Sequence, residues 1–178
     1  KSPEHYVYFA LMGVRGLRTG SVHGMKNTVS WVRKTDKAGT KGERVTRSYY
    51  LPGLRKEDVK EDHIVVHAKG GKVLRIYLAS ALLRDVQAFA RNLPAGGKLV
   101  EMTTQEANDI CKEYAREAGV PDWDRAHPHR WRHFFGTYWA RKTGRDIWKV
   151  KSLLGHSDIR SSVPYVEDLS PEEETELF

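Results

Sequence analysis

The chain has 178 residues and a formal net charge of +7. This length suits a single domain with one sizeable core, and the charge favours a polyanionic partner. The single cysteine, Cys111, excludes an internal disulfide and fits a reducing compartment, and we expect it to lie in the core. No segment reaches the roughly 18 to 20 consecutive apolar residues that span a bilayer, and none resembles a secretion signal, so we expect a cytoplasmic protein without a membrane partner.

Two helices are expected at the start of the chain. Ser2 can cap the first, and Pro3 suits its first helical position. The second should begin near Thr19, which places Arg18 at a helix N-terminus. Free N–H groups and partial positive charge at such an end favour a phosphate.

Residues 26–60 form a basic, polar run with a weak pattern, and we interpret them as an insertion or an elaborated loop. Contact with DNA and a solvated surface loop are equally open for this run. Next, 63–67 and 73–77 are β-branched runs that predict a hairpin, joined through Gly70-Gly71 between Lys69 and Lys72.

The rest of the chain reads as helical. Helices are expected over 79–92, 103–117, 129–142 and 146–154, ended in turn by Pro94, the loop at 121–128, Gly144 and Gly155. The expected fold class is mainly α with a small antiparallel β-hairpin, an α+β domain.

The last third of the chain contains most of the candidate catalytic residues. His129 and Arg132 are three apart and share one helix face, while His156 follows a helix end. Pro164 disfavours helical geometry at Val163, so Tyr165 should begin a new turn. A tyrosine can hold a phosphate as an ester, arginines match its oxygens, and histidines add hydrogen bonds or move protons.

These segments resemble the boxes of the tyrosine recombinase (phage-integrase) family. Residues 128–137 are similar to its His-x-x-Arg box, 153–157 to the next box, and Tyr165 follows at the usual distance for the nucleophile. Residues 16–21 resemble the box of the first catalytic arginine, and 63–78 the hairpin of the catalytic lysine. Five boxes in the right order cover nearly the whole chain, whereas any one alone would be weak.

The resemblance implies the catalytic-domain fold of that family and a division of roles. Arg18 and Arg132 would clamp the scissile phosphate, and His129 and His156 would donate hydrogen bonds or relay protons. Lys69 would protonate the departing 5′ oxygen, and Tyr165 would form a 3′-phosphotyrosyl bond, without cofactor, metal or ATP. Ser21 stands where the family usually has a glutamate that supports the first arginine.

Several positions have competitors. Arg15 competes with Arg18, and Lys72 with Lys69. Other candidate nucleophiles lack a neighbouring box: Tyr49, Tyr50 and Tyr138. A metal site at His127, His129 and His133 is disfavoured by Arg130 and Arg132 and by the lack of a suitable carboxylate, so His133 is read as a core or supporting residue. The core is also the preferred place for Trp131, Trp139 and Trp148.

The function expected from the resemblance is a site-specific DNA recombinase or integrase. Its partners would be double-stranded DNA and three further copies in a tetramer on paired sites, with a nucleoid-associated location. Residues 1–178 would be the catalytic domain, and we expect the smaller helical core-binding domain of the family to lie outside this sequence. The alternatives are a type IB topoisomerase-like enzyme and a catalytically silent DNA-binding module.

Overall fold

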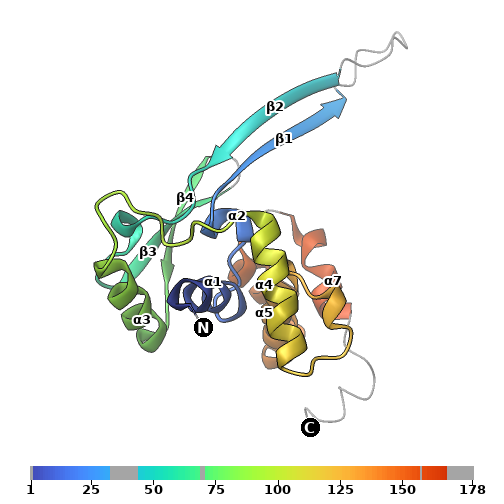
Figure 1. Ribbon diagram of the computed structural model, residues 1–178. Coiled ribbons are helices and arrows are strands. Elements are labelled where there is room, and N and C mark those ends of the chain that lie inside the picture. The colour runs from blue at the N-terminus through green and yellow to red at the C-terminus, as the bar shows by residue number, and fades with distance from the viewer. Residues whose placement is uncertain (1, 33–43, 69–70, 157, 168–178) are drawn as a thin grey trace.

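The computed structural model describes residues 2–32, 44–68, 71–156 and 158–167 (Figure 1). Most of these residues are helical, and the strands form two separate antiparallel pairs, which confirms the predicted α+β class. The helices are α1 (Pro3–Gly13), α2 (Thr19–Val22), α3 (Ser80–Arg91), α4 (Thr104–Glu117), α5 (Pro128–Lys142), α6 (Ile147–Leu154) and α7 (Val163–Glu167). The strands are β1 (Met25–Val32), β2 (Arg44–Leu51), β3 (His63–Ala68) and β4 (Lys72–Tyr77).

The main core is built around α1, which lies between α3 on one side and α4 and α5 on the other (Figure 1). Tyr8, Leu11 and Met12 of this helix are fully buried, together with side chains from α3, α4 and β3. Cys111 is buried here, as predicted. A smaller core joins α5, α6 and α7 through Phe135, Ala140, Val150, Leu154 and Tyr165. This second core fixes the elements that carry most of the candidate site.

The helix starts follow the capping residues seen in the sequence. The Ser2 hydroxyl accepts a hydrogen bond from the Glu4 N–H at 3.2 Å, and Thr103 with Glu106 forms a reciprocal capping box on α4. At its other end, α6 stops at Gly155, which has a φ of 62°. These local signals account for the agreement between the predicted and observed helix bounds.

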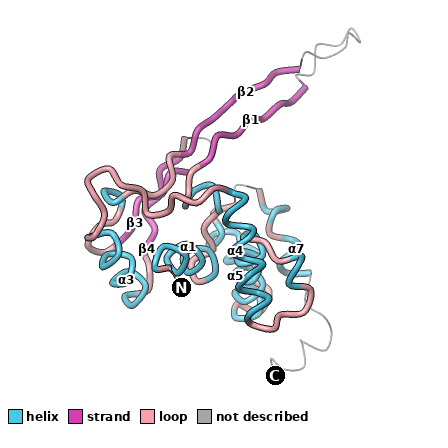
Figure 2. Tube along the Cα trace, in the orientation of Figure 1, coloured by secondary structure: helices cyan, strands magenta, loops and turns pink. Residues whose placement is uncertain are grey.

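Strands β1 and β2 were missed by the sequence analysis. They pair antiparallel from Met25 with Leu51 to Val32 with Arg44, where an elaborated loop was expected. Figures 1 and 2 show this hairpin extending away from the helical body. The charges of 26–60 obscured an alternation of polar and apolar residues in β1 that is typical of a strand.

Two other expectations were wrong. Val163 is the first residue of α7, because a proline in the first turn of a helix interrupts no hydrogen bond there. Tyr165 nonetheless lies in a new turn, separate from the 3-10 turn Ile159–Ser161. Trp148 is 66% exposed and Trp131 is 39% exposed, whereas Trp139 packs against the smaller core as expected.

Candidate active site

Arg132 is a buried cation on α5. The residue is only 2% exposed, and its guanidinium donates to the carbonyl of Gly16 and, at 2.7 Å, to the carbonyl of Leu154. Burial and the nearby charge of Arg18 lower the pKa of Arg132 to about 10, while the Tyr165 side chain acts in the opposite direction. The side chain is therefore charged at neutral pH and held in one orientation by backbone groups from two distant segments.

His156 lies just past the end of α6 and is 9% exposed. Its Nδ1 is 2.8 Å from the hydroxyl of Ser162, which is itself fully buried. Burial, followed by the charges of Arg132, Arg18 and His129, lowers the pKa of His156 to about 4. The imidazole is consequently neutral at pH 7 and can act as a hydrogen-bond donor through one ring nitrogen.

Tyr165 brings α7 against the same region. It is 4% exposed, and its ring centroid is 5.8 Å from that of His156 and 4.9 Å from that of His133. The ring packs directly over Gly136 of α5, where a Cβ atom would overlap it. A glycine at 136 thus lets the tyrosine approach α5 closely enough to interact with Arg132.

Arg132, His156 and Tyr165 form a cluster, and His129 lies on its exposed side, one helical turn before His133. The two rings meet edge to face at a centroid distance of 4.9 Å. Partial burial and the charges of His133, Arg132, His127 and Arg18 lower the pKa of His129. His133, expected to be a core or supporting residue, is exposed rather than in the core, and its ring lies between those of His129 and Tyr165.

The structure separates the two candidates for the first arginine. Arg18 is the exposed N-cap of α2, and its charge lowers the pKa values of Arg132, His129 and His156. Arg15 instead donates to the carbonyls of Tyr77, at 3.3 Å, and Leu153, at 3.1 Å. Arg18 is therefore close enough to the cluster for its charge to act on three of its members, whereas the Arg15 guanidinium is used to hydrogen-bond backbone carbonyls at the end of β4 and in α6.

Support for Arg18 comes from a neighbour in the chain. Tyr8 is fully buried on α1 and shares a hydrogen bond with the hydroxyl of Thr19, the residue after Arg18. Burial raises the pKa of Tyr8 to about 12, so the phenol stays protonated. Ser21, at the position where a glutamate is usual in the resembled family, is buried beneath the same turn.

Lys69, the predicted catalytic lysine, lies outside the described residues. Its hairpin is present as predicted, with strands β3 and β4 paired from His63 with Tyr77 to Ala68 with Lys72. Lys72, the competing lysine, is exposed at the start of β4.

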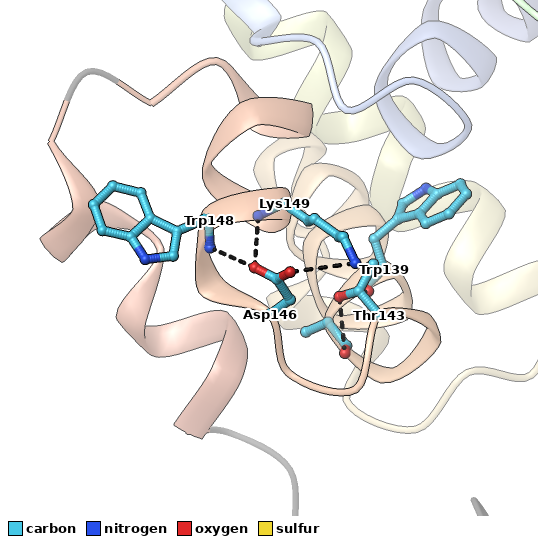
Figure 3. Close-up of polar contacts among 6 residues, drawn as sticks. Trp139, Thr143, Asp146, Trp148 and Lys149 are labelled. Atoms are coloured by element: carbon cyan, nitrogen blue, oxygen red, sulfur yellow. Dashed lines mark hydrogen bonds and ion pairs between the residues drawn. The ribbon is translucent and has the colours of Figure 1, made fainter.

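The start of α6 is fixed by Asp146, as Figure 3 shows. Its carboxylate accepts hydrogen bonds from the backbone N–H groups of Trp148 and Lys149, both at 3.0 Å, and lies 3.3 Å from the Lys149 ammonium. These contacts hold the helix whose far end presents His156. The Trp148 ring is largely exposed and points away from the Asp146 carboxylate (Figure 3).

Over the described residues, no three histidine, cysteine or carboxylate side chains are grouped as a metal site requires. Among the same residues, no helix is both long and apolar enough to cross a bilayer. The cluster offers instead two arginines, three imidazoles and a phenol, a set suited to an anion.

The sequence pattern of the phage integrase family matches residues 46–171. The chain belongs to this family. Similar curated relatives are the tyrosine recombinase XerA of Thermococcus kodakarensis, 28% identical over 130 residues, and XerC of Pseudomonas aeruginosa, 31% identical over 127 residues. The matches cover 66% and 65% of this chain but only 44% and 41% of those proteins, so the chain spans less than half the length of either relative.

Solved structures of tyrosine recombinases have the same fold. The crystal structure of XerA recombinase aligns with 99% of this chain and 55% of its own, with a TM-score of 0.67 and 18% identity. XerH recombinase bound to its difH substrate in a post-cleavage complex aligns with 98% of this chain and 44% of its own, with a TM-score of 0.66 and 15% identity. These likenesses establish the catalytic-domain fold that the sequence predicted.

Two members of the cluster had no distinguishing signal in the sequence. Ser162 contacts His156, but a lone serine beside a proline-containing turn resembles any turn residue. For His133, the sequence indicated only a core or supporting residue rather than a specific neighbour. Its position between His129 and Tyr165 depends on how α7 packs on α5, which local spacing does not specify.

Proposed function

We propose that residues 1–178 are the catalytic domain of a site-specific DNA recombinase or integrase, which breaks and rejoins DNA through a 3′-phosphotyrosyl bond. The observation that carries this proposal is the buried Arg132, fixed by two backbone carbonyls beside Tyr165 and His156. Among the residues that the structure describes, no carboxylate is paired with Arg132. Burying such a cation is costly, and a phosphate ligand would offset that cost.

In the proposed reaction, the Tyr165 oxygen attacks the scissile phosphorus. The bond from phosphorus to the 5′ oxygen breaks, and Lys69 donates a proton to that oxygen. Arg18 and Arg132 bind the non-bridging oxygens as their charge builds, and neutral His156 donates a hydrogen bond to one of them. His129 accepts the tyrosine proton, because its lowered pKa keeps it neutral near pH 7.

The ester retains the free energy of the broken bond, so rejoining to another 5′ hydroxyl requires no ATP, metal or cofactor. The partners in this proposal are double-stranded DNA and further copies of the chain in a tetramer on paired sites. The corresponding location is the cytoplasm, in association with the nucleoid. The charge of +7 supports the DNA partner.

The experiment is an incubation with nicked duplexes that carry candidate target sites, in the absence of metal. Because of the nick, cleavage releases a short fragment that carries the free 5′ hydroxyl. Once this fragment has diffused away, religation is prevented and the covalent intermediate accumulates. We expect a denaturant-stable adduct from the unaltered chain and from the matched control Tyr138→Phe, and none from Tyr165→Phe. Salt-sensitive DNA binding without any adduct would indicate a DNA-binding module instead.

A further inference from the structure

The β1–β2 hairpin is a basic ribbon that extends beyond the helical body (Figure 2). Its strands contain Lys26, Arg44 and Arg47 and no aspartate or glutamate. Each strand has eight residues, which corresponds to about 26 Å at roughly 3.3 Å per residue. A two-stranded hairpin has little stability alone, so a ribbon of this length is suited to lie against a partner.

The strand register divides the ribbon into two unlike faces. Cross-strand partners share a face, and successive residues alternate between faces. One face holds the pairs Lys26–Tyr50, Thr28–Ser48, Ser30–Thr46 and Val32–Arg44. All of these residues except Val32 are of types whose side chains can form hydrogen bonds, and none is an acid.

The described side chains of this polar face are open to solvent. Lys26, Thr46 and Tyr50 are exposed, with Tyr50 at 62%. The opposite face begins at Leu51, which is 7% exposed at the root of the ribbon. At the root of the ribbon, the apolar Leu51 is therefore buried, whereas the described cation and hydroxyls of the polar face, at Lys26, Thr46 and Tyr50, are accessible to solvent.

The root of the ribbon adjoins the candidate active site. β1 begins shortly after α2, whose N-cap is Arg18, and the Leu54 N–H donates to the Val22 carbonyl at 2.9 Å. Gly24 and Gly53 approach so closely there that a Cβ on Gly53 would meet the Gly24 backbone. This close packing fixes the direction in which the ribbon leaves the body.

We propose that the β1–β2 hairpin is a second DNA-binding element, whose polar face contacts duplex DNA outside the phosphate held by the arginine cluster. Cations and hydroxyls without carboxylates suit phosphates and base edges, and the major groove admits a two-stranded ribbon. Its length corresponds to about 8 base pairs at roughly 3.4 Å each. This inference rests on the proposed function for the position of the DNA.

The test measures equilibrium binding to a fluorescently labelled duplex by anisotropy. The duplex has about 40 base pairs, and its sequence is arbitrary because phosphate contacts are sequence-independent. All proteins carry Tyr165→Phe, so that no covalent adduct forms. The ribbon variant is Lys26→Gln with Arg44→Gln. The matched control, Arg84→Gln with Arg91→Gln, removes the same charge from exposed positions on α3.

We expect the ribbon variant to bind about 10-fold more weakly, and its slope of log K against log salt to fall by about two, since each lost phosphate contact removes about 0.9. The control should change affinity by less than about 2-fold.

Equal losses in the two charge variants would overturn the proposal, because only net charge would then matter. An unchanged affinity with a loss of protein–protein association on DNA would also overturn it and would assign the ribbon to a second copy of the chain. If the unaltered chain, with Tyr165 in place, forms no adduct on nicked duplexes while ribbon-dependent binding persists, the result contradicts the proposed reaction alone.

Discussion

Arg132 is a buried guanidinium that donates hydrogen bonds to the carbonyls of Gly16 and Leu154. Those contacts orient the side chain but do not neutralise it. A lysine has one compact charge and cannot hold two carbonyls and a phosphate together in the same plane. The residue is thus suited to orient as well as to attract a phosphate.

We expect Arg132→Lys to slow adduct formation by roughly 100- to 1000-fold, the usual effect of losing one fixed donor to a transition state. Arg130→Lys, an exposed change on the same helix, is the control and should have little effect. The measurement is the single-turnover rate on a nicked duplex. Equal rates for the two variants would show that only positive charge is needed.

His156 predicts a specific dependence of stability on pH. Its pKa is about 4 in the folded protein and about 6.5 when unfolded, so the unfolded state binds more protons between these values. The stability due to neutral His156 is present above pH 6.5 and is lost as the pH falls toward 4. Urea unfolding should show that the unaltered protein loses about 1 to 2 kcal/mol more than His156→Gln between pH 7 and pH 5. Parallel curves for the two proteins would contradict the buried, neutral imidazole.

Tyr8 provides a test of how Arg18 is positioned. Tyr8→Phe keeps the packed ring but removes the hydroxyl that contacts Thr19, which should cost about 1 kcal/mol of stability. We also expect slower adduct formation at saturating DNA, since Arg18 follows the position of Thr19. Phe9→Leu is a comparable core change on the same helix without that contact, and it should affect stability but not the rate at saturating DNA. Equal rate losses in both variants would reduce Tyr8 to a packing residue.

At the scale of elements, the helices were predictable because their ends are encoded locally. Ser2, Thr103 and Asp146 each accept a backbone N–H at the helix start, and Gly155 ends α6. The β1 and β2 strands were not predictable in the same way. Their pairing joins residues that are far apart in the sequence, such as Met25 and Leu51. The segment between the strands is charged, and its composition resembles that of a loop.

The cap of α6 should matter for catalysis as well as for stability. Asp146→Ala removes an acceptor for two N–H groups and the ion pair with Lys149 (Figure 3). We expect the melting temperature to fall by a few degrees and adduct formation to slow, because α6 presents His156. Asp146→Asn retains an acceptor and should restore most of both properties. A rate unaffected by Asp146→Ala would mean that His156 is held by Ser162 alone.

At the scale of the whole molecule, the sequence predicted the fold class and the order of the family's boxes. The spacing of His129 and Arg132 placed them on one helix face, and the resemblance to the family indicated that His156 and Tyr165 would join them. The chain alone did not predict the support beneath them. Gly136 under Tyr165, and the Gly16 carbonyl at Arg132, bring together segments that are far apart in sequence.

The most direct test of the account is to identify the residue that carries DNA. The adduct from a nicked duplex would be digested with protease and nuclease, and the peptide that retains a nucleotide would be sequenced by mass spectrometry. We expect a 3′-phosphate linked to Tyr165 and to no other residue. A nucleotide on Tyr138, Tyr49 or Tyr50, or a linkage through a 5′-phosphate, would contradict it.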